Sequence, residues 1–304
     1  MSANRKNELG VINYLKKNLI SKTPFIVKGI GDDAAVIKID KNRYLLSTCD
    51  MLIENKHFRK TDNLFDVGHK AVSCSLSDIA AMGGEPKFAL VSLGIPHRLN
   101  FKDIKYLYKG LKSASHRFSV DIIGGDTNAS DKLIIDISVI GFVNAKKVIL
   151  RSGVKVGYYI FVTGSLGGSI YGRHLKFIPR IKEAKFLTEN FKLNAMIDVS
   201  DGLVIDLWRV LEASNVGAAI FENLIPVHRD AKKLHEALYM GEDFELLFTM
   251  PEDCANILLK NISENKIKFP VSFIGKIIDN KSKIYLIDKS SSKFTMLKPK
   301  GYLH

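Results

Sequence analysis

Aspartates at turns and strand ends are the residues of this sequence best suited to chemistry. Asp32 and Asp33 follow Gly29-Ile-Gly31 and precede an expected strand, and Asp126 follows Gly124-Gly125 at an expected strand end. The others of the set are Asp50, Asp78, Asp198 and Asp201. Because the carboxyl ends of strands in α/β sheets face a common crevice, such side chains can converge on one point. Unpaired carboxylates repel one another there unless divalent cations neutralise them, so the set predicts a metal site.

The type of ligand selects the metal. Mg²⁺ prefers hard oxygen ligands and usually bridges protein carboxylates to substrate phosphates. A set rich in aspartate and poor in histidine and cysteine therefore favours Mg²⁺ over Zn²⁺. The three cysteines, Cys49, Cys74 and Cys254, are scattered and form no CxxC pair. They fit a reducing compartment, with neither a zinc site nor a disulfide framework.

Each aspartate also has an ordinary structural explanation. Asp after Gly is common in turns, and Asp before a helix is a common N-cap. Asp201 could therefore simply cap a helix that begins near Leu203. Asp78 is harder to explain in this way, because it lies inside an expected buried helix, where Asp is a poor helix former. The prediction of a metal site thus depends on the whole set.

Other segments could bind phosphate. Gly29 to Ala34 matches G-x-G-x-x-A, but it puts two carboxylates where a pyrophosphate would approach a helix, and a strand-like segment follows, so we reject a dinucleotide site. Gly164 to Ser169 could place N–H groups around a phosphate, or could be an ordinary strand–helix turn. Arg151 is a candidate phosphate clamp or a solvated linker residue. No P-loop motif and no protein-kinase signature set is present, so ATP, if used, binds to another scaffold.

Alternating strands and helices must position these residues. We expect strands at 34–39, 44–49, 88–95, 133–143 and 159–162, another strand ending at Asp198, and helices at 67–82, 102–116, 203–214 and directly after the turn 164–168. The pattern breaks at 151–157 into a polar link that contains glycine. We place a domain boundary there, between a first domain of residues 1–150 and a second of residues 151–304. The sequence therefore predicts an α/β fold with two domains in tandem.

Composition narrows the function classes. The 304 residues are 46% apolar and 25% charged, which is enough for a packed core and argues against disorder. No stretch approaches the roughly 18 apolar residues that span a bilayer, and the polar start lacks the apolar segment of a secretory signal, so we expect a cytoplasmic protein without a membrane partner. The net charge of +13 could attract nucleic acid. Because the basic residues are dispersed, the charge is only weak evidence for binding polyanions of some kind, such as nucleotides, and a merely Lys-rich composition is the alternative.

Several different short motifs follow one another in a characteristic order along nearly the whole chain. They lie at 29–36, 48–51 with His57-Phe58, 75–83, 124–127, 151–153, 162–164, 197–203, 241–246 and 300–302. Any one of them is weak, but the ordered set is highly specific. Together they resemble the thiamine-monophosphate kinase family. That family belongs to a wider group with aminoimidazole ribonucleotide synthetase, selenophosphate synthetase and a hydrogenase-maturation protein.

The resemblance implies a fold and an activity. The fold would be the two-domain α+β fold of aminoimidazole ribonucleotide synthetase, in which the N-terminal sheet pairs with that of a second copy as a dimer barrel. A C-terminal α/β sandwich would close a cleft that holds ATP and several Mg²⁺ ions. The homodimer would transfer a phosphoryl group directly from ATP to thiamine monophosphate, giving thiamine diphosphate and ADP.

The resemblance also assigns residues. The metal positions are Asp33, Thr48, Cys49, Asp50, Asp78, Asp126, Asp198 and Asp201, of which Asp33, Asp50, Asp78 and Asp126 would be catalytic. The ATP positions are Gly125, Asp126, Arg151 and Ser200, and the positions near the thiamine phosphate are His57, Glu242 and Tyr302. Cys49 departs from the usual threonine, although a main-chain carbonyl there could still bind metal. The segment between Arg173 and Asp198 is shorter than in familiar members, which puts any contact made by the missing part in doubt.

Other interpretations stay open at this stage. The chain could be another ATP-dependent enzyme of the wider group, a metal-dependent phosphatase, or a basic nucleic-acid-binding protein without catalysis. Selenophosphate synthesis would need a reactive cysteine in an N-terminal loop, and none precedes Cys49. For the kinase, the nucleophile is a phosphate oxygen whose second pKa is near ~6, so it is largely ionised at neutral pH and needs no general base.

Overall fold

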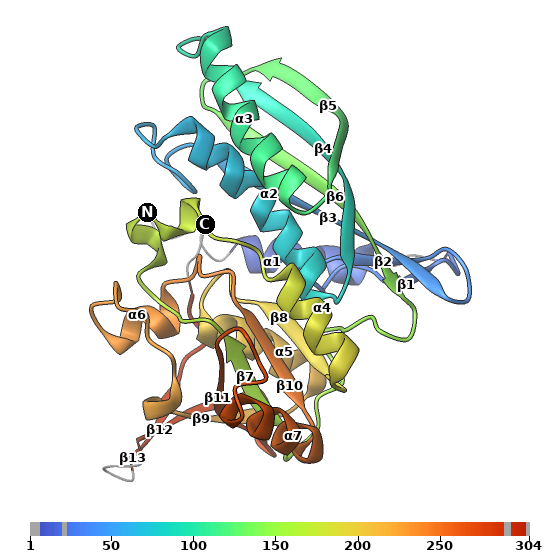
Figure 1. The fold of residues 1–304 in the computed structure, drawn as a ribbon, viewed down its shortest axis with the longest axis vertical. Helices are drawn as coiled ribbons and strands as arrows, with labels where there is room; N and C mark the ends of the chain where they lie inside the picture. Colours follow the sequence, from blue (N-terminus) through green and yellow to red (C-terminus); the bar gives the residue numbers. More distant parts are fainter. Residues whose placement is uncertain (1–6, 20–22, 289–292, 302–304) are drawn as a thin grey trace.

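Two mixed sheets, each with its own helices, divide the chain into the upper and lower parts of Figure 1. The computed structural model describes residues 7–19, 23–288 and 293–301. Strands up to Asn144 form the first sheet, and strands from Tyr159 onward form the second. The predicted α/β class with two units in tandem is confirmed, while the boundary at residue 150 stays a prediction. Among the described helices, none is long and apolar enough to cross a membrane.

The first sheet is buried on one face only. Its strands are β1 (Ile26–Lys28), β2 (Ala35–Lys38), β3 (Arg43–Ile53), β4 (Glu85–Ile95), β5 (Asp121–Ala129) and β6 (Ile134–Asn144), in the order β1-β2-β3-β6-β4-β5. Neighbouring strands are antiparallel, except for the parallel pair β4 and β5. In β6, Ile135, Ile137 and Val139 are fully buried, while Asp136 and Ser138 between them are only half-buried. Successive side chains of a strand point to opposite faces, so this alternation marks a covered face and an open face.

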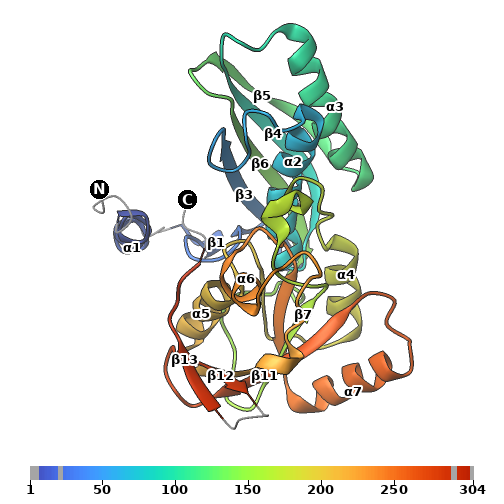
Figure 2. The ribbon, with the colours of Figure 1, turned by 90° about the vertical axis from the view of Figure 1, so that its left-hand side faces the viewer.

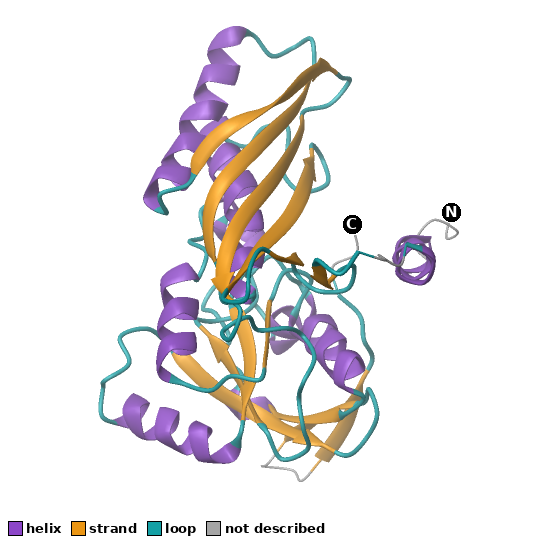
Figure 3. Cartoon of the chain, turned by 90° about the vertical axis from the view of Figure 1, so that its right-hand side faces the viewer, coloured by secondary structure: helices purple, strands orange, loops and turns teal. Residues whose placement is uncertain are grey.

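Two helices cover the buried face, as Figure 3 shows from the open side. α2 (Leu64–Ala81) begins at Asn63, whose side chain accepts from the N–H groups of Phe65 and Asp66. It ends where Gly83 adopts a φ of +70°, a conformation that favours glycine. α3 (Phe101–Arg117) begins with a capping box. α1 (Asn7–Asn18) lies to one side of both sheets (Figure 2).

The second sheet is covered on both faces. Its strands are β7 (Tyr159–Thr163), β8 (Ala195–Asp198), β9 (Gly217–Phe221), β10 (Leu246–Met250), β11 (Val271–Ile278), β12 (Ile284–Asp288) and β13 (Lys293–Leu297), in the order β13-β12-β9-β11-β7-β10-β8. The helices of this unit are α4 (Ile181–Asn190), α5 (Leu203–Ser214), α6 (Leu234–Tyr239) and α7 (Glu252–Ser263). Alternate residues of β7 enter two cores, one with α4 and α7 and the other with α5. This explains why every residue of β7 is buried.

α2 connects the two units. It packs on α3 and the first sheet, and it also contacts α4 and β8 of the second unit. One continuous core therefore runs from the first sheet through α2 into the second sheet. A side chain on α2 can reach both units, so polar residues on this helix are placed to meet residues that lie far away in the sequence.

Several predicted boundaries are wrong in ways that matter for the site. β3 continues to Ile53 and β5 to Ala129, so Asp50 and Asp126 lie within strands and not after them. The helix expected after residue 168 is replaced by two short 3₁₀ turns, Ser169–Tyr171 and Arg173–Leu175, because glycines with positive φ interrupt the segment. Asp201 is not the N-cap of α5, since that position is held by Gly202.

The close crossing of α2 and α3 depends on glycine. A Cβ added at Gly110 would lie 1.9 Å from the carbonyl oxygen of Phe65. We expect Gly110→Ala to lower the melting temperature by several degrees, because backbone atoms must separate and overpacking costs about 1–3 kcal/mol. Gly10→Ala in α1 is the control, since nothing lies within 4 Å of an added Cβ there. Equal melting temperatures for the two variants would contradict this packing.

Candidate active site

Three carboxylates from distant parts of the chain meet between the two units. Asp33 precedes β2, Asp78 lies in the last turn of α2, and Asp198 ends β8. One carboxylate oxygen from each lies within 4.8 Å of the others. The predicted convergence of aspartates therefore holds for these three, and the first and second units both contribute to the cluster.

Hydroxyl groups fix the orientation of the carboxylates around this cluster. Thr48 Oγ1 donates to Asp78 over 2.6 Å, and Ser77 Oγ donates to Asp198 over 2.7 Å. On the same side of β3, Asp50 accepts a hydrogen bond of 2.8 Å from Ser75. Small donors on α2 and β3 thus hold the acidic side chains in place without adding positive charge.

The cluster is electrostatically unfavourable as it stands. Burial raises the pKa of Asp78 well above its ordinary value, and the neighbouring charges of Asp50, Asp198 and Asp33 raise it further. Burial, followed by the charge of Asp33, raises the pKa of Asp198 in the same way. Burial is also the main cause that raises the pKa of Asp32 to about 6. These shifts mean that the folded protein holds its carboxylates at a cost whenever they are ionised without a cation.

The donor set fits Mg²⁺. Asp33 Oδ2 is buried and has no hydrogen-bond donor among the described residues. A buried carboxylate oxygen is costly without a donor or a cation, so this atom marks a place for a positive charge. All the groups that converge here offer oxygen, which suits Mg²⁺ and not Zn²⁺.

Arg151 supplies a positive charge beside the cluster. Its guanidinium donates to Asp33 Oδ1 over 2.5 Å, and its main-chain N–H donates to Asp32 over 3.0 Å. Although residue 151 lies in the link between the two units, its side chain is only 18% exposed and pairs with Asp33. The alternative of a solvated linker residue is therefore wrong.

A cavity of about 230 Å³ opens beside the cluster. Its lining includes Asp50, His57, Ser200, Asp201 and Glu242. A neighbouring cavity of about 260 Å³ shares His57 and Glu242 with it. His57 and Glu242 were predicted to bind the substrate, and the other three residues were predicted to bind metal or ATP. The structure thus brings both groups to one cavity.

Lys70 lies buried in the wall of this cavity and was missed by the sequence analysis. Its Nζ donates to the carbonyl oxygen of His57 over 2.7 Å and lies 2.7 Å from Glu242 Oε2. It thereby ties α2 to the loop that carries Glu242. The sequence did contain an indication of its position. Lys70, Cys74 and Asp78 are spaced by four residues, so they lie along one face of a buried helix.

The loop that carries Glu242 has an unusual backbone. Gly241, Glu242 and Phe244 have φ values of +72°, +61° and +51°. Such conformations are uncommon for residues other than glycine and cluster at functional sites. Phe244 is held by stacking on Phe177, with ring centroids 4.1 Å apart. The loop also packs on the Asp201 segment, since the N–H of Glu242 donates to the carbonyl oxygen of Ser200 over 2.6 Å.

Two other predicted metal residues lie on the opposite face of the first sheet. The strand register places Asp126 in a row with Ser92, Asp136 and Met51, all on the open face. Cys49 also points to that face, because Thr48 and Asp50 on either side of it contact α2 residues. Within a single chain, the structure does not bring the side chains of Asp126 and Cys49 to the carboxylate cluster.

Glycines explain some of the remaining motifs. A Cβ at Gly125 would lie 1.7 Å from the carbonyl oxygen of Val91, so only glycine fits beside β4. A Cβ at Gly301 would lie 2.5 Å from the carbonyl oxygen of Asp201, which places the C-terminal motif against the site. Tyr302 itself lies outside the described residues. In the turn 164–168, the N–H of Gly167 donates to Asp243, so this amide serves the fold and not a phosphate.

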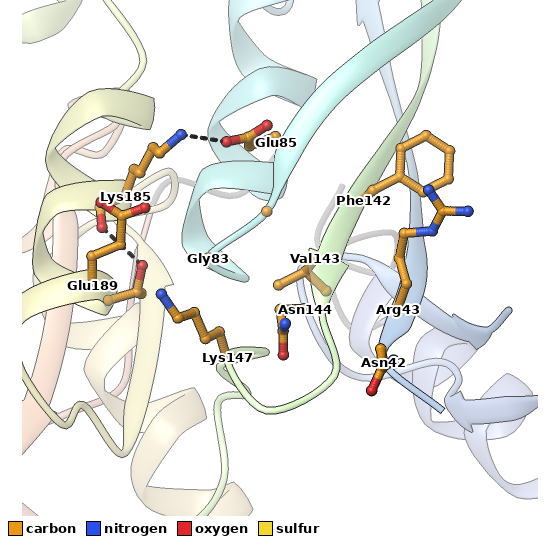
Figure 4. Close-up of a pocket in the computed structure, with 12 residues that line it drawn as sticks. Asn42, Arg43, Gly83, Glu85, Phe142, Val143, Asn144, Lys147, Lys185 and Glu189 are labelled. Carbon is orange, nitrogen blue, oxygen red and sulfur yellow. Dashed lines mark hydrogen bonds and ion pairs between the residues drawn. The ribbon is translucent and has the colours of Figure 1, made fainter. Parts of the chain in front are cut away.

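A larger hollow of about 460 Å³ lies elsewhere, between the start of β4 and α4 (Figure 4). An ion pair between Lys185 and Glu85 crosses it. None of its 12 lining residues belongs to the predicted site. We therefore place the candidate active site at the carboxylate cluster and its adjoining cavity.

Comparison with known proteins assigns both units to one family. Residues 31–143 match the AIR synthase related protein N-terminal domain, and residues 155–287 match the corresponding C-terminal domain. The thiamine-monophosphate kinase of Bacillus subtilis is 35% identical over 91% of this chain and 93% of its own length. That of Buchnera aphidicola from Schizaphis graminum is 36% identical over 98% of both chains.

Solved structures agree with this assignment. AaThiL complexed with AMPPCP and TMP has a TM-score of 0.83 and 29% identity, and the match covers 98% of this chain and 96% of that one. The thiamine monophosphate kinase of Aquifex aeolicus has a TM-score of 0.76 with 28% identity. The hydrogenase maturation protein HypE in complex with ATP is 16% identical and shares the fold, with a TM-score of 0.73. The chain belongs to the thiamine-monophosphate kinase family of AIR synthase related proteins.

Proposed function

We propose that this protein is a Mg²⁺-dependent thiamine-monophosphate kinase that transfers the terminal phosphoryl group of ATP directly to thiamine monophosphate, giving thiamine diphosphate and ADP. The observation that carries the proposal is the cluster of Asp33, Asp78 and Asp198, beside a cavity lined by Asp50, Ser200 and Glu242. The structural relative that holds AMPPCP, an analogue of ATP, together with TMP supports the choice of both substrates. The family assignment favours this activity over a phosphatase or a nucleic-acid-binding protein.

The carboxylates and the arginine give each side chain a role. When bound, Mg²⁺ would supply positive charge that lets two anionic phosphates approach. Asp33, Asp50, Asp78 and Asp198 would hold it, with Thr48 positioning Asp78. Arg151 already lies beside Asp33, and its guanidinium can turn to a phosphate oxygen of ATP. Ser200, which lines the cavity, would contact the nucleotide.

The cavity suits the acceptor substrate. Lys70 Nζ contacts both the Glu242 carboxylate and the carbonyl oxygen of His57, so these two substrate-binding candidates are held close to each other. The His57 ring accepts the N–H of Ile53 at Nδ1, which leaves the proton on Nε2. Tyr302 would complete the substrate site from the C-terminal segment. A phosphate oxygen that is already ionised is the nucleophile, which agrees with the lack of a clear general base among these residues.

The open face of the first sheet supports the proposed homodimer. Met51, Phe88, Leu90 and Ile123 are exposed apolar residues on the strands of this sheet, and no described helix covers their face. Exposed apolar area of this kind marks an interface. Asp126, Gly125 and Cys49 lie on the same strands. We therefore expect the second copy to cover this face and to complete the surroundings of Asp126.

The activity can be tested directly. Wild-type protein mixed with MgATP and thiamine monophosphate is expected to form thiamine diphosphate, measured by chromatography, and excess EDTA is expected to stop it. Asp78→Asn is expected to lower turnover by at least ~100-fold, because it removes a charge from the centre of the cluster. Release of free phosphate without thiamine diphosphate would indicate a phosphatase. Turnover of Asp78→Asn equal to that of wild type would refute the role of the cluster.

The same variant should be more stable than wild type when no metal is present. Asp78→Asn removes one of several repelling charges, so we expect its melting temperature at pH 8 without metal to rise by about 2–4 °C. The raised pKa values of Asp78 and Asp198 mean that the folded state binds more protons than the unfolded state. The free energy of unfolding of wild type therefore falls as pH rises above ~4. Asp32 contributes to this fall, because burial raises its pKa to about 6 in the folded state. Differential scanning fluorimetry at pH 5 and pH 8, with and without Mg²⁺, measures both effects, and a less stable variant would contradict them.

The dimer can be tested on the open face. Leu90→Glu places a charge among exposed apolar side chains, so we expect it to shift the protein from dimer to monomer in sedimentation velocity. Ile257→Glu is the control, because Ile257 is also an exposed apolar residue but lies on α7, far along the chain from this sheet. A wild-type monomer, or a Leu90→Glu variant that stays dimeric, would count against this face as the interface.

A further inference from the structure

The loop between β8 and α5 is held by two residues of the helix that follows it. This loop contains Ser200 and Asp201, and Gly202 ends it at the N-cap of α5. Asp206, in the first turns of α5, is fully buried. Its Oδ2 accepts from the N–H of Asp201 over 3.0 Å and from the N–H of Gly202 over 3.1 Å. A side chain from within the helix thus does what an N-cap side chain usually does, since Gly202 has none.

Arg209 closes a ring around Asp201. Its guanidinium donates to Asp206 Oδ1 over 2.5 Å and to Asp201 Oδ2 over 2.5 Å. Asp201 is therefore held through its main chain by Asp206 and through its carboxylate by Arg209. The bond to the Asp201 carboxylate is not needed to cap the helix, because Asp206 already satisfies the two N–H groups.

The ring lies next to the carboxylate cluster. Asp201 lines the same cavity as Asp50, and the charge of Asp206 acts on Asp198 at the end of β8. The loop is also confined from outside, because an added Cβ at Gly241 would lie 2.6 Å from the carbonyl oxygen of Ser200. Little room remains for the loop to shift, and Arg209 holds the Asp201 carboxylate by a hydrogen bond.

We propose that Asp206 and Arg209 are positioning residues that orient Asp201 for a divalent cation held jointly with the carboxylate cluster. The inference rests on the proposed function, because it takes Mg²⁺ as the ion of this site. Residues that hydrogen-bond to metal ligands fix their orientation, and their loss typically weakens metal affinity 10–100-fold. Neither Asp206 nor Arg209 is among the residues that line the cavity.

When Arg209 is replaced by a neutral residue, the loss of its charge and the loss of its hydrogen bonds should change cation affinity in opposite directions. This makes the proposal testable. Removing a positive charge close to a cation site should strengthen cation binding by Coulomb attraction. Removing the group that orients Asp201 should weaken it. Arg209→Lys keeps the charge, but an ammonium group cannot hold two carboxylates with the planar fork of a guanidinium.

The experiment measures metal binding by the full chain with Mn²⁺ alone as the probe. Electron paramagnetic resonance of free Mn²⁺ gives the dissociation constant for wild type, Arg209→Lys and Arg209→Met, without any need for turnover. Arg98→Met is the matched control, because Arg98 also pairs with a buried carboxylate, that of Glu54. Circular dichroism and the melting temperature show whether each variant is folded, and if Arg209→Met does not fold, Arg209→Lys alone decides.

We expect Mn²⁺ affinity to fall about 10-fold or more in Arg209→Met and less in Arg209→Lys, with the control unchanged. In the kinase assay, the same variants should need more Mg²⁺ for half-maximal rate, with the KM for thiamine monophosphate unchanged. Equal or tighter Mn²⁺ binding by folded Arg209→Met, or equal binding by Arg209→Lys where the Met variant does not fold, would overturn the positioning role. If wild type made no thiamine diphosphate but the affinities differed as expected, the proposed reaction would fail and the positioning role would stand.

Discussion

Repulsion among buried carboxylates is the constraint around which the rest of this structure is arranged. One carboxylate oxygen from each of Asp33, Asp78 and Asp198 lies within 4.8 Å of the others, and Asp33 and Asp198 are buried while Asp78 is half-buried. Like charges at such distances raise the free energy of the folded state unless protons or cations offset them. Thr48, Ser75 and Ser77 donate hydrogen bonds, and Arg151 offers one positive charge. Two large apolar cores provide the stability that allows the chain to tolerate the cluster.

Much of the fold could be predicted because its elements carry local signals. The alternation in β6, the glycines after α2 and the apolar run of β7 each indicate their own structure. The convergence of Asp78 with Asp33 and Asp198 could also be predicted, since an aspartate within a buried helix needs a reason to be there. The motifs that resemble the family then supplied the roles, which local patterns alone do not contain.

The parts that could not be predicted depend on register and on tertiary partners. Asp126 was expected at a strand end, but β5 continues past it, and a strand has two faces that a sequence cannot assign without its neighbours. The helical spacing of Lys70 from Asp78 could indicate a buried position, but its partners, Glu242 and the carbonyl group of His57, are known only from the folded chain. Arg209 likewise acts on a residue eight positions earlier only because a tight loop turns the chain back. Such contacts exist only in the folded chain.

Because α2 lies between the two sheets, each half of the chain depends on the other for partners of some of its buried polar and charged side chains. Lys70 on this helix neutralises Glu242 of the second unit, and Ser77 serves Asp198. If the two halves were made as separate polypeptides, one would carry a buried lysine without its acid, and the other would carry acids without their donors. Within one chain, each of these groups lies beside its partner from the other unit. The link near residue 151 therefore joins two units that depend on each other to compensate buried polar and charged groups.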